Sequence, residues 1–143
     1  MLRKLFICAA VLLATTGVYA KESGTGKNTD NSRVKIKYNY RYDDIVNYLY
    51  SFNNPKLILI AHCESFDFKT NKYNIRAVGD GGKAYGLLQF HYSTFMEFAE
   101  RVRMHHPHWK NPYQQIYIAN WMIRHGYIRR WSCYGILKHY HRL

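Results

Sequence analysis

Acidic residues are few in this chain of 143 residues: nine Asp and Glu stand against 21 Lys and Arg, and the formal net charge is +12. The first twenty residues hold two of these cations and none of the acids, so the rest keeps a net charge of about +10. A chain this basic is expected to meet an anionic partner, such as a cell-wall polymer, a membrane surface or extracellular nucleic acid. The alternative is a basic surface that serves solubility alone.

Long hydrophobic runs are also missing, apart from residues 5–14, and this run is too short to span a bilayer. It follows Arg3 and Lys4 and precedes residues 18–20 (Val-Tyr-Ala), which suit a cleavage site. These features predict an export signal peptide over residues 1–20. We therefore expect an exported protein, periplasmic, cell-wall-associated or secreted, with no integral membrane segment after cleavage.

Cysteine is scarce too, with three in the whole chain, and Cys8 lies inside the predicted signal peptide. The remaining pair, Cys63 and Cys133, allows a single intramolecular pairing. An even number of cysteines in an exported chain favours a disulfide. This bond would close a loop of roughly seventy residues, worth on the order of 4 kcal/mol in the chain-entropy description. Two free thiols are the alternative.

Metal-ligand spacing is missing as well. His105, His106 and His108 lie close together in sequence, and His62 lies apart from them. His62 directly precedes Cys63 and Glu64, but the chain shows no set of such residues at the defined spacing of zinc sites. We interpret these histidines as solvated, and we predict neither a metal site nor a cofactor.

The sequence predicts one domain that is preceded by a linker. Residues 21–33 are polar, contain Gly and lack periodicity, which is typical of a flexible linker. Residues 34–42 alternate in part and could be a short strand or an extended lead-in. Because the part of the chain after residue 20 fits one hydrophobic core, we expect a single domain over residues 34–143.

Hydrophobic spacing near 3.6 residues predicts a mainly α domain. The first two expected helices are residues 44–52, capped by Asp43, and Pro55 to Ser65, capped by Asn54. A third is capped by Ser93 or Thr94, with a Thr94–Glu97 capping box, and a fourth begins at Asn111 and Pro112 and stops at Gly126. A short basic, aromatic helix is expected within residues 129–143. Residues 66–85 show no helical pattern, and the Asp80-Gly81 step suits a hairpin. The predicted fold class is a small helical domain with a short β-hairpin or irregular excursion after the second helix.

One glutamate lies where a charge is costly. The helix that begins after Asn54 places Glu64 on the same face as Leu57, Ile60 and Ala61, and we expect that face to be buried. Burial disfavours an ionised carboxylate and raises its pKa. A carboxyl that stays protonated near neutral pH can act as a general acid. The alternative is a glutamate at a fraying helix end whose carboxyl reaches water.

Six short motifs follow one another along the chain. They are Cys63-Glu64-Ser65, Gly86-Leu87-Leu88-Gln89-Phe90, Ser93-Thr94-Phe95, Gln114-Gln115-Ile116, Gly126 and Trp131-Ser132-Cys133. Their order resembles the lysozyme-like superfamily of bacterial cell-wall glycosidases, and in particular its transglycosylase-like, resuscitation-promoting-factor-type group. The resemblance implies an α+β lysozyme-like fold and a catalytic domain.

The resemblance also implies roles for matching residues. Glu64 matches the catalytic general acid/base. Cys63 and Cys133 match the disulfide pair of that group.

Three further residues fall where such proteins line their glycan cleft: Gln89 and Thr94, with Tyr85 as a flanking aromatic. Two features depart from the pattern. Leu88 is inserted in the Gly-Leu-Gln-Phe motif, which restores the G-L-x-Q of the wider transglycosylases. The loop between Glu64 and Gln89 is several residues longer, and this leaves the place of any second carboxylate open.

The scarcity of acidic residues limits which mechanisms of glycoside cleavage are available to the chain. Most glycosidases use two carboxylates, and only Asp67 and Asp80 lie near Glu64 in sequence. We interpret Asp80 first as a turn residue, and Asp67 could equally be solvated. A lytic transglycosylase needs no second carboxylate, because the N-acetyl group and the 6-hydroxyl of the sugar take its place. This route fits the composition better, although hydrolysis stays open.

We therefore predict an exported peptidoglycan glycosidase, a lytic transglycosylase or muramidase, that cleaves MurNAc–GlcNAc linkages as a monomer. The alternative is a non-enzymatic cationic cell-wall-binding or secreted effector protein. A third hypothesis, nucleic-acid binding by the basic tail, lacks a recognised module and conflicts with export, so we expect no nucleic-acid partner. Aromatic residues that could stack on sugars are Tyr85, Phe90, Tyr92, Trp109, Tyr113 and Trp131.

Overall fold

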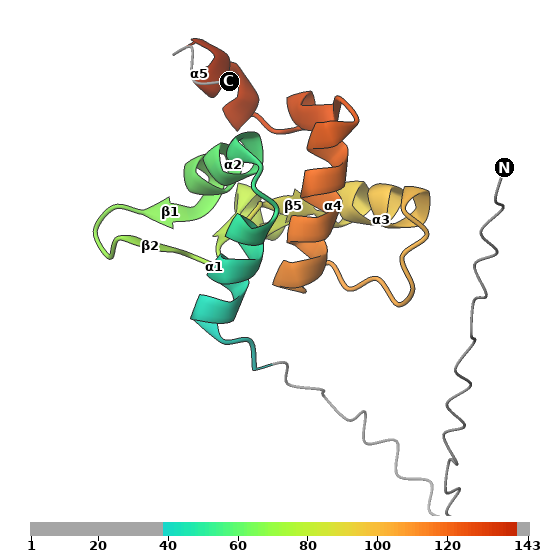
Figure 1. The fold of residues 1–143 in the computed structure, drawn as a ribbon, viewed down its shortest axis with the longest axis horizontal. Helices are drawn as coiled ribbons and strands as arrows, with labels where there is room; N and C mark the ends of the chain where they lie inside the picture. Colours follow the sequence, from blue (N-terminus) through green and yellow to red (C-terminus); the bar gives the residue numbers. More distant parts are fainter. Residues whose placement is uncertain (1–38, 140–143) are drawn as a thin grey trace, which may run out of the picture. The chain divides into compact units, whose positions relative to one another are not determined.

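The structure is a computed structural model and describes residues 39–139. The predicted signal peptide (1–20), the linker (21–33) and most of the predicted extended segment lie outside the described residues. Within the described range, five α-helices pack on one apolar core, and two small antiparallel sheets lie between the second and third helices in chain order (Figure 1). The predicted class, a small and mainly α domain with a short β excursion, is confirmed.

The helices are α1 (Tyr42–Ser51), α2 (Pro55–Ser65), α3 (Tyr92–Arg101), α4 (Pro112–Arg124) and α5 (Cys133–His139), with the 3₁₀ turns η1 (Asp80–Gly82) and η2 (Tyr127–Arg130). The strands are β1 (Phe66–Asp67), β2 (Lys72–Tyr73), β3 (Val78–Gly79), β4 (Ala84–Tyr85) and β5 (Phe90–His91). β1 pairs with β2, and β4 lies between β3 and β5. None of the helices between residues 39 and 139 has the length and apolarity needed to cross a bilayer.

Two predicted helix starts are confirmed, and both use the same chemistry. The Asn54 side chain accepts a hydrogen bond from the Leu57 amide (3.4 Å), and the Asn111 side chain accepts one from the Tyr113 amide (3.0 Å). A proline follows each cap at the first helical position, where its missing N–H costs nothing. The Asn54 amide also donates to the buried Asn120 (2.9 Å), which joins the start of α2 to α4.

Two predicted caps are wrong. Helix α1 begins at Tyr42, so Asp43 lies in its first turn, where a negative charge suits the helix dipole, and Arg41 takes the cap position. The Thr94–Glu97 capping box does not form, because β5 runs directly into α3 and fixes the start of that helix at Tyr92. Glu97 forms ion pairs elsewhere.

The β region is larger than the predicted single hairpin. The β1–β2 hairpin follows α2 immediately, and Figure 1 shows it extending to one side of the domain. At its turn the Asp67 carboxylate accepts hydrogen bonds from the Lys69 amide (2.9 Å) and the Thr70 hydroxyl (3.0 Å). The predicted Asp-Gly turn connects β3 to β4 in the second sheet. The residues between Glu64 and Gln89 therefore form the first sheet and supply two of the three strands of the second.

One buried polar side chain connects the second sheet to α4. Gln115 is fully buried, and its amide donates to the carbonyls of Tyr85 (2.9 Å) and Trp109 (2.6 Å). Gly86 has a φ of +85° and lies against this amide, so a Cβ there would lie 2.5 Å from Gln115 Oε1. Only glycine tolerates both conditions. The motif that begins at Gly86 and the motif Gln114-Gln115-Ile116 therefore pack against each other.

Candidate active site

Glu64 lies at the end of α2, next to a cavity. The helix turns before it bury Leu57, Ile60 and Ala61 completely, and Glu64 itself is half-buried. The cavity has a volume of about 420 Å³, within the range of small-ligand sites. Its lining comes from four parts of the chain: Glu64, Asp80, Ala84, Gln89, His91, Arg130, Trp131 and Ser132.

The environment of Glu64 favours its protonated form. Burial raises the pKa of the carboxyl, and a hydrogen bond from the backbone N–H of Cys133 offsets part of this rise. Cys133 is bonded to Cys63, the residue that precedes Glu64, and the two Cα atoms lie 6.1 Å apart. The predicted disulfide is thus present, and it holds α5 beside the end of α2.

Gln89 lines the same cavity and is positioned by its own loop. Its φ is +46°, and its side-chain amide donates to the Gly86 carbonyl (2.8 Å). Its Oε1 packs against Gly79, where any Cβ would clash with it. The two glycines therefore fix the amide at the wall of the cavity rather than leaving it free in solvent.

A second acidic group faces the cavity of Glu64. The Asp80 carboxylate lies 3.2 Å from His91 Nε2, and both side chains line the cavity and are about half exposed. Asp80 has a φ of +47°, a left-handed conformation that is uncommon outside glycine. Asp67, in contrast, is absent from this lining, and hydrogen bonds led by that of the Lys69 amide lower the pKa of its carboxyl. Both aspartates near Glu64 thus lie in turns, and of the two only Asp80 lines the cavity.

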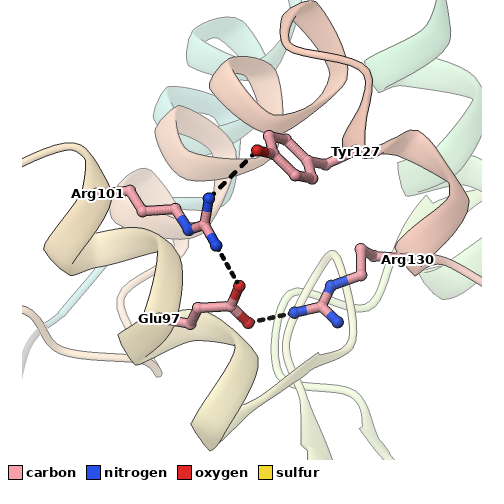
Figure 2. Close-up of polar contacts among 4 residues, drawn as sticks. All are labelled: Glu97, Arg101, Tyr127 and Arg130. Carbon is pink, nitrogen blue, oxygen red and sulfur yellow. Dashed lines mark hydrogen bonds and ion pairs between the residues drawn. The ribbon is translucent and has the colours of Figure 1, made fainter.

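Arg130 places a positive charge at the cavity, and its ion-pair partner is a residue that does not line the cavity. Figure 2 shows its guanidinium paired with Glu97 of α3, whose carboxylate also accepts from Arg101 (3.1 Å), while Arg101 donates to the Tyr127 hydroxyl (3.2 Å). No local sequence pattern indicated Arg130, because the ion pair that orients it comes from Glu97 of α3. His91 was also missed. Its position two residues after Gln89 is no strand signal, because Gln89 precedes β5 and has a left-handed backbone conformation.

The other predicted site residues lie outside this cavity. Thr94 lines a small neighbouring pocket, which shares Gln89, His91, Arg130 and Trp131 with the Glu64 cavity. Tyr85 lines a separate pocket, because it follows Ala84 along β4 and successive residues of a strand face opposite sides. The structure therefore brings Glu64 and Gln89 together, places Thr94 beside them and sets Tyr85 apart.

Two of the aromatic residues considered for sugar stacking are core residues. Phe90 and Trp131 are almost completely buried, and the Trp131 indole donates to the Leu88 carbonyl (2.9 Å). Among residues 39–139, no group of three or more His, Cys, Asp or Glu lies close enough to hold a metal ion.

The family model described as "Transglycosylase SLT domain" matches residues 46–141, about two thirds of the chain. The chain belongs to the transglycosylase SLT domain family. No curated protein and no solved structure matches it. The family confirms the resemblance that the six motifs indicated, and it supports a transglycosylase-type activity on peptidoglycan at the level of the family. Every residue that lines the Glu64 cavity lies inside the matched part of this SLT domain.

Proposed function

We propose that this SLT domain is an exported peptidoglycan glycosidase that cleaves MurNAc–GlcNAc linkages, with Glu64 as general acid and then general base. The observation that carries the proposal is the Glu64 carboxyl, whose pKa burial raises, in a cavity lined also by Gln89. The family membership supports the substrate class. Gln89 and Thr94 are proposed as residues that contact the glycan.

The proposed reaction needs one proton-transfer group. Protonated Glu64 gives its hydrogen to the bridging oxygen, and the bond from C1 of the muramic sugar to that oxygen breaks. The N-acetyl group of the sugar stabilises the electron-poor C1. In the transglycosylase route the 6-hydroxyl then attacks C1, and the Glu64 carboxylate takes the hydroxyl proton, which regenerates the acid and leaves a 1,6-anhydro end.

Hydrolysis is the second route, and the Asp80–His91 pair favours it. Asp80 offers a carboxylate in the same cavity as Glu64, and His91 holds it at 3.2 Å. Such a group can take a proton from a water molecule that attacks C1, and the product then has a reducing end. The same domain can therefore form both kinds of end.

Asp80→Asn is expected to lower the share of reducing ends among the fragments at least several-fold, while anhydro ends persist. The amide keeps the shape of the carboxylate but cannot accept a proton from water. Mass spectrometry of the released muropeptides measures the ratio, because an anhydro end is lighter by one water. Asp67→Asn, at the exposed turn, is the matched control and should leave the ratio unchanged. Equal ratios in the two variants would contradict a role for Asp80.

The pH dependence follows from the direction of the Glu64 shift. A general acid works while protonated, so fragment release should persist to higher pH than an ordinary glutamate allows and then fall as the pH passes the raised pKa. Asp80, His91 and Arg130 also line the cavity, so the full profile will carry their charges as well. The measurement is the initial rate of fragment release across pH. A rate that falls already at the ordinary pKa of glutamate would contradict the assignment.

The stability of the fold should follow the same pKa. Because the folded-state pKa of Glu64 lies above that of the unfolded chain, its stabilising contribution is complete at low pH and is lost as the pH rises through the folded value. Glu64→Gln should therefore be more stable than the parent near neutral pH, and this advantage should shrink in acid. Urea unfolding of both proteins across pH measures the difference.

Export and wall association complete the proposal. Residues 1–20 support export, and the disulfide suits an oxidising compartment. The excess of positive charge would hold the protein on an anionic wall. The deciding experiment incubates purified sacculi with the protein and analyses the soluble fraction. Release of muropeptides supports the glycosidase, and binding without release would support the alternative of a non-enzymatic wall-binding or effector protein.

A further inference from the structure

A second pocket lies on the opposite face of β4 from the Glu64 cavity. We call it the Tyr85 pocket; it has a volume of about 280 Å³, and its lining is Tyr40, Ile75, Arg76, Tyr85, His108, Lys110 and Pro112. It shares none of these residues with the Glu64 cavity. Its size suits one sugar ring or an amino acid rather than a long polymer segment.

The charge of the Tyr85 pocket is positive. Arg76 and Lys110 are exposed cations in its lining, His108 lies beside them, and no acidic residue lines the pocket. The ion pairs found among residues 39–139 involve neither Arg76 nor Lys110. Their charges are therefore not neutralised by a carboxylate of the described chain, and they favour an anionic ligand.

Two aromatic rings contact Lys110: Tyr85 lines the pocket, and Trp109 lines a neighbouring pocket and packs against Tyr85. The Lys110 ammonium lies 5.0 Å from the Tyr85 ring and 5.4 Å from the Trp109 ring, and the two rings are 5.7 Å apart. Such cation–π contacts hold the ammonium at the rim of the pocket. Tyr85 is half-buried and lines the pocket, so part of its side chain is accessible to a ligand there.

The positions of Tyr85 and Trp109 are set before any ligand binds. The buried Gln115 amide donates to the carbonyls of both Tyr85 and Trp109, two residues that are 24 positions apart in the chain. Its Oε1 packs against Gly86, the residue after Tyr85. Because these contacts set the backbone under both rings, little order has to be created on binding, which favours affinity.

We propose that the Tyr85 pocket is an accessory binding site for a carboxylate-bearing sugar unit, such as a muramic acid residue with its stem peptide, of a wall segment other than the one being cleaved. The inference rests on the proposed function for the identity of the polymer. Arg76 and Lys110 bind a free carboxylate of the stem peptide, because the lactyl carboxyl of muramic acid is used in the amide bond to that peptide, and the Tyr85 ring contacts the sugar. A second binding site of this kind raises the effective concentration of glycan at the Glu64 cavity without contacting the bond that reacts.

The three tryptophans of the chain make the two sites separately observable. Trp109 contacts Tyr85 and Lys110, Trp131 lines the Glu64 cavity, and Trp121 lines neither pocket. The ¹⁵N-indole resonances of the Glu64→Gln protein are followed while a soluble disaccharide-peptide muropeptide is added. The expected result is a shift at Trp109 with its own saturation curve, distinct from that at Trp131.

The variant that tests the pocket is Arg76→Ala/Lys110→Ala in the Glu64→Gln background. It should weaken the Trp109 saturation at least tenfold and leave that of Trp131 within about twofold. Lys56→Ala/Arg124→Ala removes two exposed helical cations that line neither pocket and should change neither curve. With Glu64 intact, Arg76→Ala/Lys110→Ala should release fragments more slowly from sacculi but not from short soluble glycans.

Every other result of these titrations and activity measurements decides for or against the inference. The inference is overturned if Trp109 does not respond, if the two double variants behave alike, or if a neutral chitotetraose saturates Trp109 equally well. It is also overturned if inorganic phosphate or a polyphosphate competes as well as the muropeptide, since the pocket would then be a general anion site. If the parent releases nothing from sacculi while the Trp109 response and its loss are seen, the proposed function fails and the pocket stands.

Discussion

Glu64→Gln is expected to slow the release of fragments from sacculi by about 10²–10⁴-fold, the usual contribution of general acid catalysis. The amide has the size of the carboxyl and can still accept the hydrogen bond of the Cys133 amide. It cannot, however, give a proton to the bridging oxygen. The structure gives no reason for the variant to unfold, because it removes a charge that burial disfavours.

The control for this loss is Glu100→Gln. Glu100 is exposed on α3, lines none of the cavities discussed and takes part in no ion pair found among residues 39–139. It should keep the parental rate. Thermal unfolding of both variants checks the fold, and glycan binding measured through the Trp131 indole checks that the Glu64 cavity survives. A folded Glu64→Gln protein with parental activity would remove Glu64 from the mechanism.

Replacing both Cys63 and Cys133 by Ser should have the largest effect on stability, a loss of about 4 kcal/mol in the free energy of unfolding. The bond spans a sequence separation of 70, so opening it greatly enlarges the conformational freedom of the unfolded chain. It also joins α5 to the end of α2, and the backbone N–H of Cys133 bonds to Glu64. Activity should therefore fall even where the protein remains folded.

Urea unfolding of the parent with and without reductant, and of the double Ser variant, measures this effect. The reductant should destabilise the parent by about the same amount as the two substitutions, as the chain-entropy description requires. It should not affect the variant further, which also shows that Cys8 plays no part. A loss below about 1 kcal/mol would mean that packing alone holds α5 beside α2.

The parts of the fold that the sequence predicted well depend on neighbouring residues. Asn54 with Pro55, and Asn111 with Pro112, begin helices because an amide side chain caps the free N–H groups within two or three residues. The spacing of Leu57, Ile60 and Glu64 put the carboxyl at the end of a buried face for the same local reason. The disulfide partner was also determined, since one pairing remained once Cys8 was assigned to the signal peptide.

The errors arose where distant segments compete for the same residue. Thr94 and Glu97 have the spacing of a capping box, yet β5 sets the start of α3, and Arg130 pairs with Glu97 instead. The resemblance grouped Tyr85 with Gln89 in a glycan cleft, and strand alternation places the two residues at different pockets. A motif gives the order of residues along the chain and does not give the face on which each lies.

The sequence by itself determined the starts of α2 and α4, the buried face that ends in Glu64, the single disulfide and the excess of positive charge, because these depend on near neighbours or on composition. Only the tertiary structure decided that Asp80, His91 and Arg130 meet Glu64 at one cavity, and that Tyr85 belongs to another. The physical reason is that a cavity is formed by segments tens of residues apart. The packing of the whole core brings these segments together, and no local sequence pattern specifies that packing.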